Sequence, residues 1–105
     1  MKPIVILTVM AAIIVAGCTG SQGPGPNTVK MKEVKFNPDS IVIKAGETVT
    51  WVNEDPVEHQ VKVGNDMSPR LREGQSWSKT FNTPGEFDIT CTLHAQMLGR
   101  VKVTT

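Results

Sequence analysis

Apolar and polar residues alternate along most of the chain after residue 28, which is typical of strands that bury one face. Val29 and Met31 alternate with charged residues in the first such run, and Val49 and Trp51 alternate with threonines in a later one. Similar short runs occupy 34–36, 41–43, 59–63, 77–81, 87–91 and 101–103, with turn-forming residues between them. Only 64–73 leaves room for a helical turn. The pattern predicts an all-β sandwich.

The first segment has a different pattern. Met1-Lys2-Pro3 precedes an apolar run from Ile4 to Ala16. The run is shorter than the about 20 apolar residues that span a membrane, and it fits the apolar part of an export signal. It ends in Val15-Ala16-Gly17-Cys18, which resembles the cleavage motif of prokaryotic lipoproteins, where the Cys is lipidated. We predict a lipoprotein signal peptide over 1–17 and lipidation of Cys18; an ordinary signal cleaved near Ala16-Gly17 is the alternative.

The residues after Cys18 predict a tether followed by one folded domain. Thr19 to Asn27 is rich in Gly and Pro and has no apolar residue that could anchor a core. Such a composition is typical of a flexible to semi-extended linker, so we expect a tether over 18–27 and a single domain over 28–105. The chain has 11 Lys and Arg against 10 Asp and Glu, and removal of the expected signal peptide with Lys2 makes the two numbers equal. This balance gives no indication of a nucleic-acid partner.

The candidate chemistry lies in Cys91-Thr92-Leu93-His94-Ala95-Gln96-Met97, which carries a thiolate, an imidazole and a thioether. His59 is the second of only two histidines. Two His, one Cys and a weak axial Met are the ligands of a blue-copper electron-transfer site. Zinc is the chemical rival because it also binds Cys and His, but thioether sulfur favours copper. Met67 is a second candidate for the axial position.

Strand parity places two of these donors in the core. Cys91 has the parity of Ile89, and His59 has the parity of Val61. We therefore expect both donors at the inner ends of strands, with the other two donors in the loop that follows Cys91. A disulfide between Cys18 and Cys91 would consume the thiolate, so we predict none.

The chain resembles the cupredoxins, the type 1 blue-copper proteins, over essentially all of 28–105. The residues that carry the resemblance are Phe36-Asn37-Pro38, Ile41, Ala45 to Asn53, His59, Gly74, Phe81, Pro84-Gly85, Phe87, Cys91, His94, Met97, Gly99, Val101 and Val103. The short Cys-x₂-His-x₂-Met loop is similar to that of amicyanin-like members. The resemblance implies a cupredoxin-like Greek-key β-sandwich of about seven to eight strands that holds one type 1 copper ion.

By the same resemblance, His59 and His94 bind copper through Nδ1, Cys91 supplies the thiolate and Met97 is the axial ligand. Three residues depart from the common pattern: Gln60 stands where many members have Asn, Leu93 where Pro often precedes the second His, and Phe87 where Tyr is common. The first two concern hydrogen bonding around the ligands, and the third concerns packing.

The function implied is electron transfer, not enzymatic catalysis. We expect an exported monomer, lipid-anchored to the cell membrane on the periplasmic or extracellular side, that cycles between Cu(I) and Cu(II) and exchanges electrons with redox proteins. An apolar patch around His94, built from Leu93, Ala95, Pro56 and Val57, is the expected docking surface. Copper storage or delivery is the alternative, but no tract rich in Met and His follows Cys18.

Overall fold

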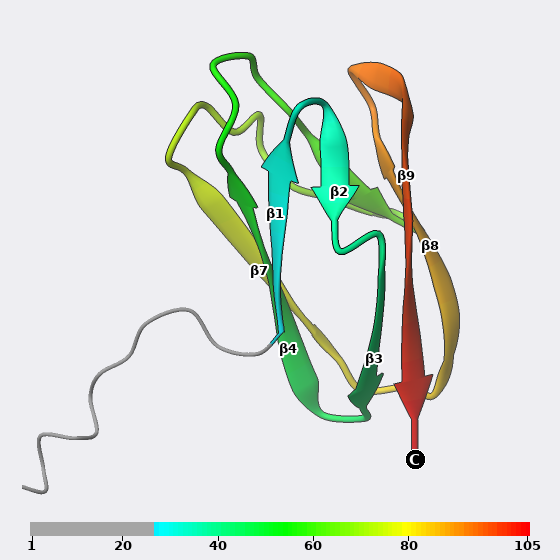
Figure 1. Ribbon diagram of the computed structural model, residues 1–105. Helices are drawn as coiled ribbons and strands as arrows, with labels where there is room; N and C mark the ends of the chain where they lie inside the picture. The colour runs from blue at the N-terminus through cyan, green and yellow to red at the C-terminus, as the bar shows by residue number, and fades with distance from the viewer. Residues whose placement is uncertain (1–26) are drawn as a thin grey trace, which may run out of the picture.

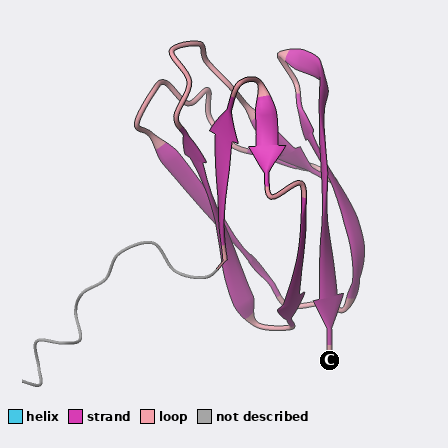
Figure 2. Cartoon of the chain, viewed as in Figure 1, coloured by secondary structure: helices cyan, strands magenta, loops and turns pink. Residues whose placement is uncertain are grey.

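The computed structural model describes residues 27–105. The expected signal peptide over 1–17, the lipidation site at Cys18 and all of the tether except its last residue lie outside the described residues. In the described part every regular element is a β-strand, as Figure 2 shows. No helix there is long and apolar enough to cross a membrane.

Two sheets pack face to face and form a sandwich (Figure 1). The first sheet has the order β2 (Lys35–Asn37), β1 (Thr28–Lys32), β4 (Glu47–Asn53) and β7 (Ser76–Phe81). The second has the order β3 (Ser40–Lys44), β9 (His94–Thr104), β8 (Gly85–Cys91), β5 (Val61–Val63) and β6 (Asp66–Met67). The all-β sandwich is thus confirmed. The nine strands of the described residues exceed the expected seven to eight because β2 and β6 are segments of three and two residues.

The sheet order requires the chain to cross between the sheets repeatedly. β1 pairs with β4 in parallel, from Thr28↔Thr50 to Met31↔Asn53, and β3 pairs with β9 in parallel. Parallel neighbours cannot be joined by a tight hairpin, so the intervening strands lie partly in the other sheet. The longest hairpin joins β8 and β9. This hairpin carries the candidate metal-binding loop at its turn.

The core lies between the sheets and is built from the alternating apolar residues. Trp51 is its largest member, and its ring centroid lies 5.6 Å from that of Trp77 and 6.4 Å from that of Phe81 in tilted contacts. The buried apolar residues are Val29, Met31, Phe36, Ile43, Val49, Trp51, Val61, Val63, Leu71, Phe81, Ile89, Cys91, Met97, Val101 and Val103. Their positions confirm the alternation predicted from the sequence.

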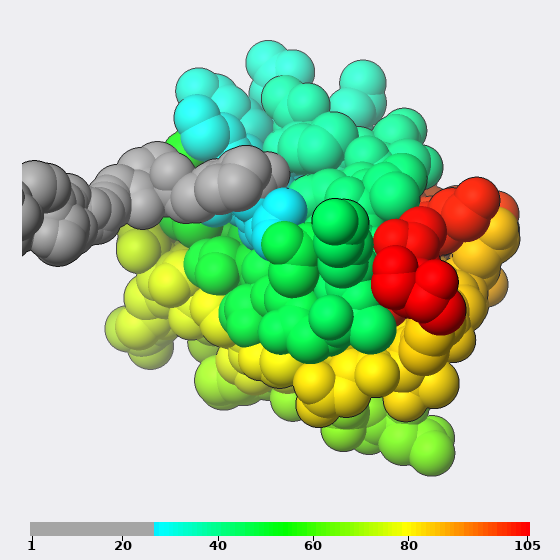
Figure 3. Space-filling view, turned by 90° about the horizontal axis from the view of Figure 1, so that it is seen from below, coloured from blue at the N-terminus to red at the C-terminus, as the bar shows by residue number. Residues whose placement is uncertain are grey.

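The two ends of the sandwich differ. The turns β1–β2 and β8–β9 and the segment between β4 and β5 gather at one end, at the top of Figure 1. At the other end, the Ala45 amide donates to the Thr104 carbonyl at 2.7 Å. Figure 3 views that end and shows the C-terminal residues against the β3–β4 turn. β1 runs toward the first end, so the chain enters the sandwich away from it.

Residues 64–73 contain no helical turn. Gly64, with φ of 60°, turns the chain between β5 and β6, and Val63 pairs with Asp66. Further on, Leu71 forms an isolated antiparallel bridge with His59. Asp66 and Met67 form the short strand β6, and within 64–73 the buried residues are Ser68 and Leu71.

Candidate metal centre

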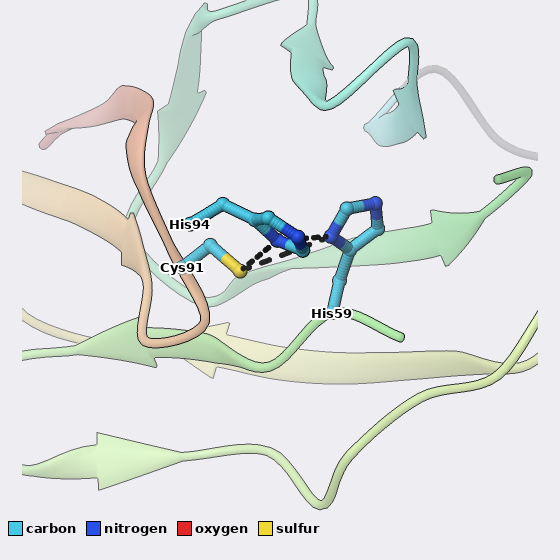
Figure 4. Close-up of side chains that lie close together, drawn as sticks. All are labelled: His59, Cys91 and His94. Carbon is cyan, nitrogen blue, oxygen red and sulfur yellow. Dashed lines mark hydrogen bonds between the residues drawn. The ribbon is translucent and has the colours of Figure 1, made fainter. Parts of the chain in front are cut away.

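Three donor atoms converge at the first end of the sandwich. Nδ1 of His59 lies 3.2 Å from Nδ1 of His94 and 3.8 Å from Sγ of Cys91. The distance between Nδ1 of His94 and Sγ of Cys91 is 3.6 Å. Figure 4 shows the three side chains pointing toward one another, Cys91 and His94 from the β8–β9 hairpin and His59 from the segment before β5. His59 and Cys91 are buried, and His94 is half-buried. The three residues are those that the sequence suggested, and the histidine nitrogen atoms are those that the cupredoxin resemblance implied.

His59 is fixed by its backbone in the segment between β4 and β5. Its amide donates to the Leu71 carbonyl at 3.0 Å, and the Leu71 amide donates back at 2.7 Å. The side chain has 0% exposure. His59 lies just before β5 and not within it, but it keeps the inward parity of Val61 that the sequence indicated.

Asn53 organises the same segment from inside the core. Its amide group donates to the carbonyls of Val57 at 2.9 Å and Leu71 at 2.8 Å. Its side-chain oxygen accepts the Asp55 amide at 2.7 Å. Asn53 is itself fully buried. One side chain thus links the two loops that flank His59.

Cys91 and His94 occupy the two sides of a tight turn. Cys91 is the last residue of β8, His94 is the first of β9, and the two are paired across the hairpin. The expectation that His94 and Met97 belong to a loop is wrong in this respect, because pairing resumes at His94 and both residues lie in β9. The two-residue turn, Thr92 and Leu93, leaves little freedom for the distance between the thiol and the imidazole.

An irregularity in β9 accommodates Met97. Cys91 pairs with His94, whereas the preceding Thr90 pairs with Leu98, so one step along β8 corresponds to four along β9. Such bulges occur near functional sites, where they redirect a side chain. Met97 is buried to 1% exposure among the core residues, while Leu98 next to it is exposed. Met67, the alternative thioether, is 53% exposed.

Gln60 joins the two ligand-bearing segments. Its carboxamide oxygen accepts the Thr92 hydroxyl at 2.6 Å, and its backbone carbonyl accepts the Thr92 amide at 3.0 Å. Its NH₂ group donates to the Ser68 carbonyl at 2.9 Å. The residue next to His59 therefore holds the turn between Cys91 and His94, so this departure from the common pattern keeps a direct link between the ligand segments.

Asp55 is the neighbour of the site that the sequence interpretation missed. Its Oδ2 accepts a hydrogen bond from Nε2 of His59 at 2.8 Å. The amides of Glu33 and Val34 donate to Oδ1 at 2.7 Å and Oδ2 at 2.9 Å. Burial raises the pKa of this carboxyl, but the hydrogen bonds from His59, Val34 and Glu33 outweigh burial, so the pKa is lowered from its ordinary value.

The hydrogen bond to Asp55 assigns the proton on His59. An ionised carboxylate can only accept hydrogen bonds, so Nε2 carries the proton. In the neutral ring, Nδ1 then presents its lone pair toward Cys91 and His94. A histidine that ligates a metal is commonly oriented in this way by a carboxylate on its other nitrogen. A carboxylate four residues before a candidate ligand is the sequence signal that could have identified Asp55.

The donor set fits the copper ion that the sequence resemblance implies. In a triangle with the three measured sides, the point equidistant from the corners lies about 2.1 Å from each atom, close to the length of metal–imidazole and metal–thiolate bonds. Two imidazoles and one thiolate suit either copper or zinc, but a thioether as the remaining donor suits copper. Met97, buried on the same hairpin, is the available fourth donor.

Comparisons with known proteins agree with this site. Residues 4–103 match the cupredoxin-like domain family. Amicyanin-alpha from Methylorubrum extorquens is 40% identical over 86 residues, which are 75% of this chain and 72% of that protein. A solved amicyanin variant in its reduced Cu(I) form has a TM-score of 0.72 at 30% identity, covering 79% of this chain and 86% of that one.

A larger protein contains a similar unit. The Cu-containing nitrite reductase of Thermus scotoductus has a TM-score of 0.71 at 30% identity, covering 81% of this chain but 24% of the enzyme chain. The resemblance drawn from residues 28–105 is confirmed by the family match, the sandwich and the relatives taken together. This chain belongs to the cupredoxin-like domain family.

Proposed function

We propose that this protein is a single-copper electron carrier in which His59, Cys91 and His94 would hold the ion, with the thioether of Met97 as the weak fourth donor. The observation that carries the proposal is the convergence of three soft and borderline donors at distances suited to one metal ion. The amicyanin relatives support the same assignment. When bound, copper supplies a one-electron couple between Cu(I) and Cu(II).

The contribution of the chain is a set of ligands held in place by other contacts. Asp55 and the Leu71 bridge hold His59, Gln60 holds the Thr92 turn, and the β8–β9 pairing fixes Cys91 against His94. Ligands that cannot rearrange reduce the structural change that accompanies a change of oxidation state. Such rigidity favours fast electron transfer over exchange of the metal.

Electrons reach the site through the exposed side of His94. The imidazole is half-buried, whereas His59 has 0% exposure and Cys91 has 4%. Ala95, Pro56 and Val57 are exposed residues from the same two ligand-bearing segments. We propose that they form a small uncharged surface on which a redox protein docks.

Storage or delivery of copper remains the competing function, and the two differ in the fate of the metal. The purified chain is loaded with Cu(I) and mixed with an excess of a competing Cu(I) chelator, and the rate of copper loss is measured. This rate is compared with the rate of electron self-exchange of the same protein. A carrier is expected to exchange electrons many times before it loses its copper. Copper loss that outpaces self-exchange would favour delivery and contradict the proposal.

We propose that the carrier is exported and anchored through lipidation of Cys18, with residues 18–27 as the tether. β1 enters the sandwich away from the metal centre, so an anchor on that side leaves the metal centre free to meet a partner. Two or more acyl chains make membrane attachment stable. Intact mass is expected to show a lipid-modified N-terminal Cys18, and an unmodified N-terminus elsewhere would refute the anchor.

We propose no enzymatic role. Among the described residues, one group of side chains could hold a metal ion, and it consists of His59, Cys91 and His94. The match to the nitrite reductase covers 24% of the enzyme chain, so most of that enzyme has no counterpart in the matched region. We also propose that the carrier is a monomer, which sedimentation of the copper-loaded chain would test.

A further inference from the structure

We propose that Asp55, anchored by the turn between β1 and β2, is a positioning residue that orients His59 and lowers the reduction potential of the bound metal. This inference rests on the proposed function, because the potential is that of a copper centre. Its structural half concerns the chain alone and can be tested without metal.

The first observation is that the Asp55 carboxylate is surrounded by donors. Its two oxygens receive three hydrogen bonds, all between 2.7 and 2.9 Å, from His59 and from the amides of Glu33 and Val34. Asp55 is 6% exposed. A carboxylate held in this way has a fixed position, so the imidazole that donates to it has a fixed ring angle and a fixed tautomer.

The second observation is the unusual turn that supplies two of these donors. Lys32 pairs with Lys35, so Glu33 and Val34 form a two-residue hairpin loop, and their φ angles are 57° and 56°. Positive φ at both central positions is the type I′ geometry, which favours Asn-Gly. A β-branched residue at positive φ is a genuine outlier. Here the turn directs both amides at the carboxylate of Asp55, which lies 22 residues after Glu33 and 21 residues after Val34 in the chain.

Strained backbone persists where surrounding structure fixes it, and it clusters at functional sites. In this domain the strained turn connects to a candidate metal ligand through a single side chain. The path runs from the Glu33 and Val34 amides to the Asp55 carboxylate, and from there to the far nitrogen of His59. The turn therefore acts as an outer support for a ligand that it does not touch.

The sign of the effect on the potential follows from charge. A carboxylate that accepts a hydrogen bond from Nε2–H makes the ring a stronger electron donor at Nδ1. It also places a negative charge one imidazole away from the metal. Both effects favour Cu(II), which carries the larger positive charge, over Cu(I). Removal of the charge is therefore expected to raise the potential.

The test compares Asp55→Asn with Glu54→Gln in the full chain loaded with copper. Both substitutions remove one negative charge from adjacent residues, but the Glu54 carboxylate faces Lys30 at 3.9 Å. For Asp55→Asn we expect the ratio of Cu(I) to Cu(II) affinity to rise tenfold or more, which is about 59 mV for a one-electron couple. For Glu54→Gln we expect less than a twofold change. Equal shifts in the two variants would overturn the proposal.

A second measurement uses the metal-free wild-type chain, so the proposal stays testable if Asp55→Asn does not fold. Nitrogen-15 NMR is expected to show neutral His59 as the Nε2–H tautomer, with an Nε2 proton that exchanges slowly with water. An Nδ1–H tautomer, or rapid exchange, would overturn the positioning role. If the wild-type chain binds no copper, the proposed function fails, whereas this measurement still decides whether Asp55 orients His59.

Discussion

Replacement of Asn53 by Ala tests whether the loops around the metal centre are held by one buried side chain. The substitution removes three hydrogen bonds, to the carbonyls of Val57 and Leu71 and from the amide of Asp55. Each such bond contributes about 0.5–1.5 kcal/mol net, and its loss leaves a buried polar group without that partner. The Leu71 carbonyl keeps the His59 amide as a donor, which moderates the loss. We expect a decrease of about 3 kcal/mol in the free energy of unfolding.

That loss is large for a domain of this size, because domain stabilities are about 5–15 kcal/mol. The assay is guanidinium unfolding of the metal-free chain, since bound copper would add its own stabilisation. We expect the midpoint to fall by about 1 M with an unchanged slope. Asn82→Ala, at an exposed position, is the control and should change stability by less than about 0.5 kcal/mol. A loss below about 1 kcal/mol for Asn53→Ala, or equal losses in the two variants, would refute the reasoning.

Three further predictions concern the axial ligand, the packing beside the hairpin and the docking surface. Met97→Gln replaces a thioether by an oxygen donor and should lower the potential in voltammetry while copper is retained; a larger shift for the exposed Met67→Gln would contradict the axial assignment. Gly99→Ala places a methyl group 2.9 Å from a backbone carbonyl oxygen and should destabilise the domain by about 1–3 kcal/mol in chemical denaturation; an unchanged midpoint would show that β9 yields easily. Ala95→Glu should slow electron self-exchange while colour and stability persist, because it puts a charge beside His94. If Lys44→Glu slows exchange and Ala95→Glu does not, electrons leave by another face.

The local pattern was sufficient to predict most of the strands, though not β6, and together with the cupredoxin resemblance it predicted that the donors converge. Parity placed Cys91 and His59 inside because side chains of a strand alternate strictly between its faces. Parity made no prediction for the start of β9, which was expected to be a loop, whereas pairing resumes at His94 and a bulge follows. Bulges depend on how two strands pair, and the residues of one strand do not specify them.

The supporting contacts could not be predicted because they join distant segments. Asp55 and Asn53 lie in a stretch whose composition is that of a turn, and turns are usually exposed, yet both residues are buried. The partners of Asp55 are amides of Glu33 and Val34, in a turn that lacks the Asn-Gly residues typical of its geometry. Only the folded arrangement shows that this carboxylate has three donors around it.

The visible spectrum of the copper-loaded chain tests the central claim most directly, because it reports the bond between Cys91 and the metal. Charge transfer from a cysteine thiolate to Cu(II) is expected to make the oxidised wild-type protein intensely coloured, and reduction should bleach it. Cys91→Ser, which removes the thiolate and keeps a side chain of similar size, should lose this intense absorption with Cu(II). An oxidised wild type without the intense band, or a Cys91→Ser protein that keeps it, would contradict the account.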